Sequence, residues 1–72
     1  MTNEQMTLPS GQIIKQMRED RLLSVLELSR LSGVSFETIK TYEAGKRVPQ
    51  VKTIRKLLEA FKKFDNEKMN QA

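Results

Sequence analysis

The sequence predicts an all-α fold, one compact domain of four to five helices. The 72 residues suffice for a single domain, because a chain this short buries only about 60% of its unfolded surface and cannot support two cores. Apolar residues recur at helical spacing, and serines suited to cap a helix precede three of these runs. The predicted helices span residues 10–20, 24–32, 35–44 and 51–62, with residues 65–70 as a fifth helix or as part of the fourth.

The composition excludes several classes of function. The chain has no cysteine and no histidine, so it lacks the usual metal ligands and the commonest general base. It has no nucleophile beside a base and no glycine loop for a phosphate, and Glu19 and Asp20 form a surface pair. We therefore expect no enzyme activity, no cofactor and no metal. No apolar run could cross a membrane and no signal segment follows Met1, which predicts a cytoplasmic protein without membrane contact.

A polar segment precedes the first predicted helix. Residues 1–9 should form a flexible tail, and residues 10–70 the folded domain. Ser10 can cap a helix whose inner side carries Ile13, Ile14 and Met17. Arg18 shares a face with Ile14, at i and i+4, so this cation needs a partner.

The next stretch has the signals of a short capped helix. Ser24 is followed three residues later by Glu27, a spacing that allows each residue to bond the amide of the other in a capping box. Leu23 and Leu28 flank this start at the spacing of a hydrophobic staple. Gly33 ends the helix, because glycine adopts a left-handed backbone without the steric cost of a Cβ atom.

A second capped helix follows immediately. Ser35 is its N-cap, and Gly45 ends it. Val34 and Ile39 form another staple. Two short capped helices around a tight glycine corner are typical of a helix-turn-helix, and the agreement of all these signals favours that interpretation.

The fourth predicted helix begins after an extended link at Val48 and Pro49, because a residue before proline avoids helix. Its apolar stripe consists of Val51, Ile54, Leu57, Leu58 and Phe61. Asp65 can cap a separate helix over residues 65–70. The alternative is that residues 62–64 continue the fourth helix, since no glycine separates the two segments.

Positive charge is concentrated in the second half of the chain. Residues 40–63 contain eight basic side chains and two acidic ones, a local balance of +6 within a total of +4. The basic side chains are Lys40, Lys46, Arg47, Lys52, Arg55, Lys56, Lys62 and Lys63. A block of one sign that begins inside the second motif helix is typical of a nucleic-acid-binding face. The alternative is an ordinary solvated helix surface.

Residues 10–61 resemble the phage-repressor-like, xenobiotic-response-element (XRE) family of bacterial transcription regulators, which has the lambda-repressor-like fold. The matching residues are Leu23, Ser24, Glu27, Leu28, Gly33, Val34, Ser35, Ile39, Glu43, Gly45, Lys46, Arg47 and Pro49, with Ile14, Lys15 and Arg18 in the preceding helix. The resemblance implies a sequence-specific regulator of transcription, acting as a repressor, that places residues 35–44 in the major groove of double-stranded DNA. The alternative is an antitoxin-like or adaptor protein of the same fold, whose basic face contacts an acidic protein.

In this family the outer face of the recognition helix contacts base edges. Glu37 can accept from cytosine N4, and Lys40 can donate to guanine. The Phe36 ring and the Thr41 methyl can touch a thymine methyl, with Thr38 beside them. Relatives often carry a glutamine in place of Phe36, so their operator preferences do not transfer.

Phosphate contacts are expected on both sides of the recognition helix. Lys46 and Arg47 follow it in a loop, where their side chains can reach the duplex backbone. Ser24 and Val25 begin the preceding helix, whose first amides can bind an anion, although relatives often carry a glutamine in place of Val25. Such contacts position the domain without specifying a base.

The resemblance also implies an ion pair and a dimer. It pairs Arg18 with Glu43 at the end of the recognition helix, the alternative being two ordinary surface charges. Relatives bind inverted-repeat operators as symmetric dimers, so a homodimer is expected. The Val48 region, the fourth helix, Phe64 and Met69 are candidates for its interface, although the last two can equally cover the core of one copy. No effector domain follows the fourth helix, so we expect no small-molecule effector.

Overall fold

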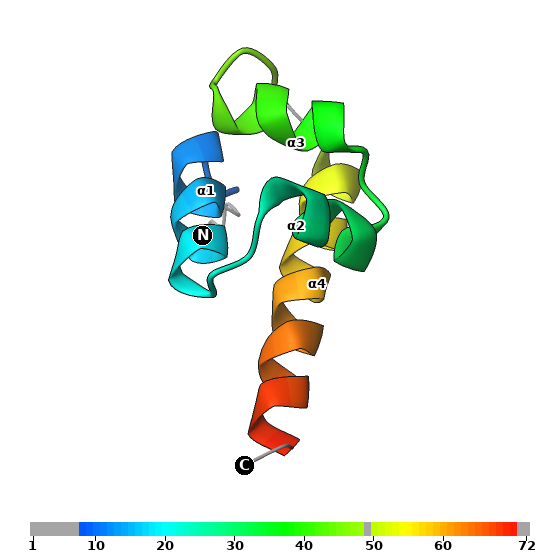
Figure 1. Cartoon of the computed structure of the whole chain (residues 1–72). Helices are drawn as coiled ribbons and strands as arrows, with labels where there is room; N and C mark the ends of the chain where they lie inside the picture. Colours follow the sequence, from blue (N-terminus) through cyan, green and yellow to red (C-terminus); the bar gives the residue numbers. More distant parts are fainter. Residues whose placement is uncertain (1–7, 49, 71–72) are drawn as a thin grey trace, which may run out of the picture.

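The computed structural model describes residues 8–48 and 50–70 and contains four helices in that part of the chain (Figure 1). They are α1 (Gly11–Asp20), α2 (Val25–Ser32), α3 (Phe36–Glu43) and α4 (Val51–Asn70). The all-α fold class is confirmed, and the first three helices agree with their predicted bounds to within one residue. Residues 1–7 of the expected tail and Pro49 of the expected link lie outside the described residues. None of these four helices is long and apolar enough to cross a lipid bilayer.

Serine side chains begin the first three helices. Each of Ser10, Ser24 and Ser35 accepts a hydrogen bond from the amide three residues further along. The capping box at Ser24 is complete, because the Ser24 amide also donates to Glu27 Oε1 at 2.8 Å. Gly33 then ends α2 with a φ of 77°, in the left-handed region that favours glycine. These local bonds satisfy helix-end groups that would otherwise be left without partners.

The core lies where the four helices meet. α2 packs against α3 and α4, and α1 packs against α3 (Figure 1). Both staple pairs are buried in this core. Its largest fully buried side chains are Phe61, Ile14, Leu28, Ile39 and Leu57. Each helix therefore contributes at least one residue that the sequence pattern marks as apolar and inward.

Two residues expected in the core are exposed instead. Ile13 was predicted on the inner side of α1, but 52% of its surface is exposed. The buried face of α1 is centred on Ile14, and a neighbouring residue lies about 100° around the helix. Val51 stands at the first position of α4 and is 51% exposed. Ala60, absent from the predicted stripe, is buried in the core.

α4 continues without a break to Asn70, so of the two predicted alternatives the structure has the continued fourth helix, and residues 65–70 form no separate helix. Asp65 accordingly caps nothing. Its carboxylate accepts two hydrogen bonds from Arg21 at the end of α1, Nε to Oδ1 at 2.9 Å and Nη2 to Oδ2 at 2.8 Å. The Arg21 guanidinium also lies 4.8 Å from the centroid of the Phe61 ring. Arg21 therefore fixes the last part of α4 against the end of α1.

We expect the pKa of Asp65 to lie below the usual value of about 3.9, because the hydrogen bonds from Arg21, and then the charges of Arg21 and Lys68, favour the carboxylate. A pKa lowered by folding means that the pair stabilises the fold above the unfolded-state pKa and loses this effect as the pH falls through the folded-state pKa. An NMR titration of the Asp65 carboxyl carbon measures the shift. Arg21→Ala should raise this pKa toward its usual value, whereas Arg30→Ala should leave it unchanged. An unchanged pKa in Arg21→Ala would contradict the pairing.

Candidate nucleic-acid interface

α3 is held through its inner face. Ile39 and Tyr42 point into the core and are 0% and 3% exposed. The Tyr42 hydroxyl donates to the Pro9 carbonyl oxygen, and burial raises the pKa of this phenol. Because the inner face is fixed in this way, side chains on the opposite face project from a rigid support.

Three of the five expected base-contacting residues are exposed. Phe36, Glu37 and Lys40 are exposed, whereas Thr38 and Thr41 are half-buried. Phe36 stands at the first position of α3 and leaves 41% of its surface exposed. The Lys40 ammonium lies 5.6 Å from the centroid of the Phe36 ring, one helical turn further along. The start of α3 therefore presents a ring, a carboxylate and an ammonium to solvent.

The two threonines use their hydroxyls within the helix. Thr41 Oγ1 donates to the carbonyl oxygens of Glu37 and Thr38, at 3.0 and 3.1 Å. Thr38 Oγ1 accepts from Ser35 Oγ at 2.8 Å. A hydroxyl hydrogen bonded to its own backbone is not free to donate to a base, so a contact from Thr41 would come from its methyl group.

The loop after α3 presents two cations. The Gly45 amide donates to the Tyr42 carbonyl oxygen, and the Lys46 amide donates to the Thr41 carbonyl oxygen, both at 3.0 Å. The side chains of Lys46 and Arg47 are exposed. Backbone hydrogen bonds thus anchor Lys46 next to α3 while its ammonium remains in solvent.

The capping box limits the groups that the start of α2 offers to a phosphate. The capping box engages the Ser24 hydroxyl oxygen, which accepts from the Glu27 amide at 3.0 Å, and the Ser24 amide, which donates to the Glu27 carboxylate. Val25 is half-buried and packs against the core. A phosphate that accepted from the Ser24 amide would have to displace the Glu27 carboxylate, which is also negatively charged.

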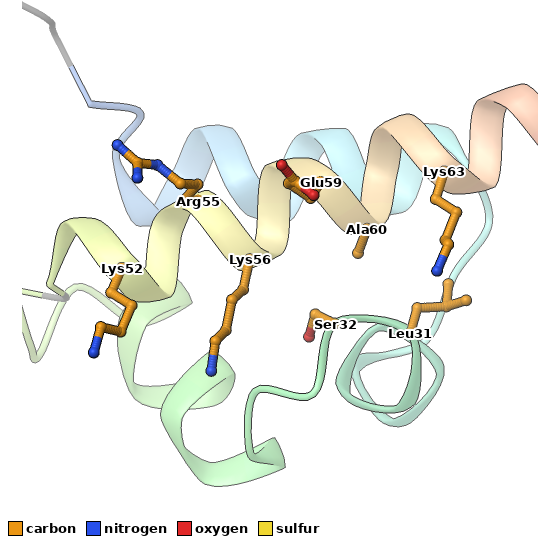
Figure 2. Close-up of a pocket in the computed structure, with 8 residues that line it drawn as sticks. All are labelled: Leu31, Ser32, Lys52, Arg55, Lys56, Glu59, Ala60 and Lys63. Atoms are coloured by element: carbon orange, nitrogen blue, oxygen red, sulfur yellow. The ribbon is translucent and has the colours of Figure 1, made fainter.

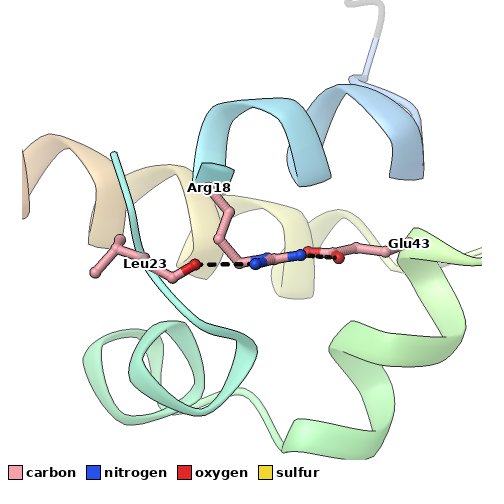
Figure 3. A network of polar contacts seen from close by, with 3 residues as sticks. All are labelled: Arg18, Leu23 and Glu43. Carbon is pink, nitrogen blue, oxygen red and sulfur yellow. Dashed lines mark hydrogen bonds and ion pairs between the residues drawn. The ribbon is translucent and has the colours of Figure 1, made fainter. Parts of the chain in front are cut away.

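Arg18 joins three segments of the molecule (Figure 3). Its Nε donates to Glu43 Oε2 at 2.9 Å and its Nη2 donates to Glu43 Oε1 at 2.8 Å. Its Nη1 donates to the Leu23 carbonyl oxygen at 2.9 Å. The side chains of Arg18 and Glu43 are only 11% and 7% exposed, and the hydrogen bond to Glu43 raises the pKa of Arg18 above its usual value. The pair fixes the last residue of α3 to α1 and to the segment that leads into α2.

Gly11 lies at a close approach between α1 and the backbone of Tyr42 in α3, which the sequence pattern does not predict. It is buried at the start of α1, and a Cβ atom built on it would lie 1.9 Å from the Tyr42 carbonyl oxygen. Only glycine therefore fits at this crossing of α1 and α3. The only signal in the sequence was that a residue without a Cβ atom stands at the first position of the helix, directly after the Ser10 cap.

A groove of about 420 Å³ lies between the end of α2 and α4 (Figure 2). It is lined by Leu31, Ser32, Lys52, Arg55, Lys56, Glu59, Ala60 and Lys63. Lys52, Lys56 and Lys63 extend from the side of α4 that faces α2 and α3. Glu59 is the single acid among the lining residues, so the groove is positive at neutral pH. Its charge adds to the field that attracts a polyanion to the molecule.

Two curated relatives come from Bacillus subtilis (strain 168). The HTH-type transcriptional repressor RghR is 47% identical over 53 residues, which are 72% of this chain and 39% of that protein. The uncharacterized HTH-type transcriptional regulator RghRB is 42% identical over 55 residues, which are 75% of this chain and 40% of that protein. The chain thus spans about two fifths of the length of the curated relatives that it matches. No solved structure gives a significant match.

The helix-turn-helix family pattern matches residues 14–63. This stretch includes α2, α3, the loop that carries Lys46 and Arg47, and both partners of the Arg18–Glu43 pair. It covers more than half of the chain. The chain therefore belongs to the XRE-type helix-turn-helix family.

Proposed function

We propose that this chain is a sequence-specific, double-stranded DNA-binding regulator of transcription that acts as a repressor. The observation that supports this most strongly is the outer face of α3, where Phe36, Glu37 and Lys40 are exposed while Ile39 and Tyr42 hold the helix in the core. A helix of this kind fits the major groove with its first residues toward the base edges. The protein would act in the cytoplasm, without catalytic activity or a cofactor.

Each exposed group of this surface has a distinct role in the proposal. Glu37 accepts from cytosine N4, Lys40 donates to guanine, and the Phe36 ring contacts a thymine methyl. The Lys46 and Arg47 side chains bind phosphates beside the groove and set the register of α3. The Arg18–Glu43 pair contacts no DNA but holds the end of α3 in place.

The regulator would bind an inverted repeat as a homodimer, since one domain of this size covers about half of an operator. Val48 and Met69 are 93% and 74% exposed and are available for a second copy. Phe64 is half-buried and packs against the core, so it is a weaker candidate. Sedimentation at micromolar concentration measures the oligomeric state, and a monomer both free and on its operator would contradict the dimer.

Selection of bound sequences from random duplexes tests the proposal. We expect a salt-sensitive, sequence-selective complex, because phosphate contacts supply affinity and the face of α3 supplies preference. The recovered sites should form an inverted repeat. No mobility shift at low salt, together with a co-purifying acidic protein, would instead favour the adaptor function.

Lys46→Ala should weaken binding to all duplexes alike and reduce the slope of log K against log salt concentration by about one, because one phosphate contact is lost. Fluorescence anisotropy titrations at several salt concentrations measure both quantities. Lys68→Ala is the matched control, since Lys68 lies near the far end of α4 and should leave the slope unchanged. A changed sequence preference with an unchanged slope would place Lys46 in the groove instead.

A further inference from the structure

The contact between Phe36 and Lys40 joins two groups that would otherwise act separately. Both side chains are exposed at the outer face of α3, four residues apart. The Lys40 ammonium lies over the Phe36 ring at 5.6 Å from its centroid, within the range of a cation–π contact. A lysine side chain is flexible, so a ring beneath it restricts where the ammonium can lie.

We propose that Phe36 and Lys40 read DNA as one unit, which selects a thymine and a guanine within two base pairs of each other. This inference rests on the proposed function and names the base chemistry that the same surface selects. The ring has no polar atom, and the thymine 5-methyl is the apolar group that base pairs present in the major groove. Phe36 therefore selects thymine.

The second half of the unit is the ammonium. Guanine presents two acceptors in the major groove, O6 and N7, and an ammonium only donates. Stacked bases of one strand are about 3.4 Å apart. The Lys40 ammonium lies 5.6 Å from the centroid of the Phe36 ring, a distance shorter than two such steps. If the ring contacts a thymine, the ammonium therefore reaches a base no more than two positions away.

Neighbouring side chains on α3 reinforce this assignment. The Thr41 hydroxyl hydrogen is committed to the carbonyl oxygens of Glu37 and Thr38. The Thr38 hydroxyl, which accepts from Ser35, is half-buried, so Lys40 is the exposed, charged donor of this face. The Glu37 carboxylate is an acceptor and cannot bind guanine O6 or N7. Guanine recognition by these residues of α3 therefore depends on Lys40, and the position of Lys40 depends on the ring.

Changes to single groups of the DNA bases test the unit directly. The half-site recovered by selection is prepared with deoxyuridine in place of the thymine, which removes only the 5-methyl, or with 7-deazaguanine in place of the guanine, which removes N7. For the unaltered chain, we expect deoxyuridine to weaken binding about fourfold, the factor for about 0.8 kcal/mol per buried methyl. The 7-deazaguanine duplex should bind about fivefold more weakly.

Two variants of Phe36 separate the two halves of the unit. Phe36→Ala should bind the thymine and deoxyuridine duplexes equally and should lose most of its discrimination against 7-deazaguanine, because nothing positions the ammonium. Phe36→Leu keeps an apolar contact and should retain the thymine preference while losing the guanine effect. Lys68 lies over Phe64 near the end of α4, so Lys68→Ala is a matched control. It should keep both the thymine preference and the discrimination against 7-deazaguanine. Circular dichroism verifies that each variant is folded.

The outcomes distinguish this inference from the function on which it rests. Sequence-selective binding with equal affinity for thymine and deoxyuridine would overturn the unit and leave the proposed function intact. Full guanine discrimination by Phe36→Ala would do the same. Binding without any sequence preference would overturn the proposed function itself.

Discussion

Alanine at Gly11 should lower the free energy of unfolding by about 3 kcal/mol or more, because it overpacks the crossing of α1 and α3. The added Cβ would lie 1.9 Å from the Tyr42 carbonyl oxygen and 2.8 Å from the Tyr42 carbonyl carbon. Both are backbone atoms, so no side-chain rotation relieves the clash and the helices must separate. Alanine has a higher helix propensity than glycine, but this stabilises the fold by only about 1 kcal/mol. The clash is larger, so the net effect of the substitution is destabilising.

Thermal unfolding followed by circular dichroism measures this effect. Gly33→Ala is the matched control, because an added Cβ there meets nothing within 4 Å and its cost is limited to the left-handed backbone, about 1–2 kcal/mol. Gly11→Ala should therefore melt below Gly33→Ala, and it should also lose DNA affinity, because α3 moves with Tyr42. A Gly11→Ala variant that melts at or above the control would contradict the close approach.

The parts of the fold that the sequence predicts correctly are those set by local bonds. Ser24 and Glu27 bond each other across three residues, and Gly33 ends the helix through its own backbone. Such signals need no knowledge of what packs against the helix. The pattern of apolar residues likewise places Leu28 and Ile39 in the core.

The features that the sequence did not predict depend on contacts between distant segments. Asp65 resembles a helix cap, but Arg21, 44 residues earlier, pairs with it inside a continuous helix. The role of Gly11 arises from the backbone of Tyr42, which no local pattern includes. Leu22 adopts a φ of 58° after α1, where glycine would be expected, and its amide bonds the Glu19 carbonyl oxygen.

At the candidate site too, the sequence predicts what depends on helix geometry and does not predict what depends on individual side-chain contacts. Helical periodicity assigns Phe36, Glu37 and Lys40 to the outer face, and all three are exposed. Helical periodicity does not reveal which acceptor a hydroxyl group binds. The hydrogen bonds from the Thr41 hydroxyl to carbonyl oxygens of its own helix are therefore not predicted from the sequence. The contact between the Lys40 ammonium and the Phe36 ring also depends on side-chain conformation, which spacing alone leaves open.

Arg18→Ala should destabilise the fold by about 3–5 kcal/mol, because it leaves the Glu43 carboxylate buried without its partner. The Glu43 side chain is 7% exposed and accepts two hydrogen bonds from Arg18. The variant also removes the donor to the Leu23 carbonyl oxygen. Thermal unfolding measures the loss, and DNA affinity should fall with it, since the end of α3 is then free to shift.

Lys15→Ala is the matched control, because Lys15 lies one turn earlier on α1, is exposed and belongs to the same resemblance. Its melting temperature should stay near that of the unaltered chain, and equal melting temperatures for the two variants would contradict a structural pair. The double variant Arg18→Met/Glu43→Leu identifies the origin of the loss. If the stranded carboxylate dominates, replacing both charges with apolar side chains should recover much of the stability lost in Arg18→Ala. If the attraction itself dominates, the double variant should be no more stable than Arg18→Ala.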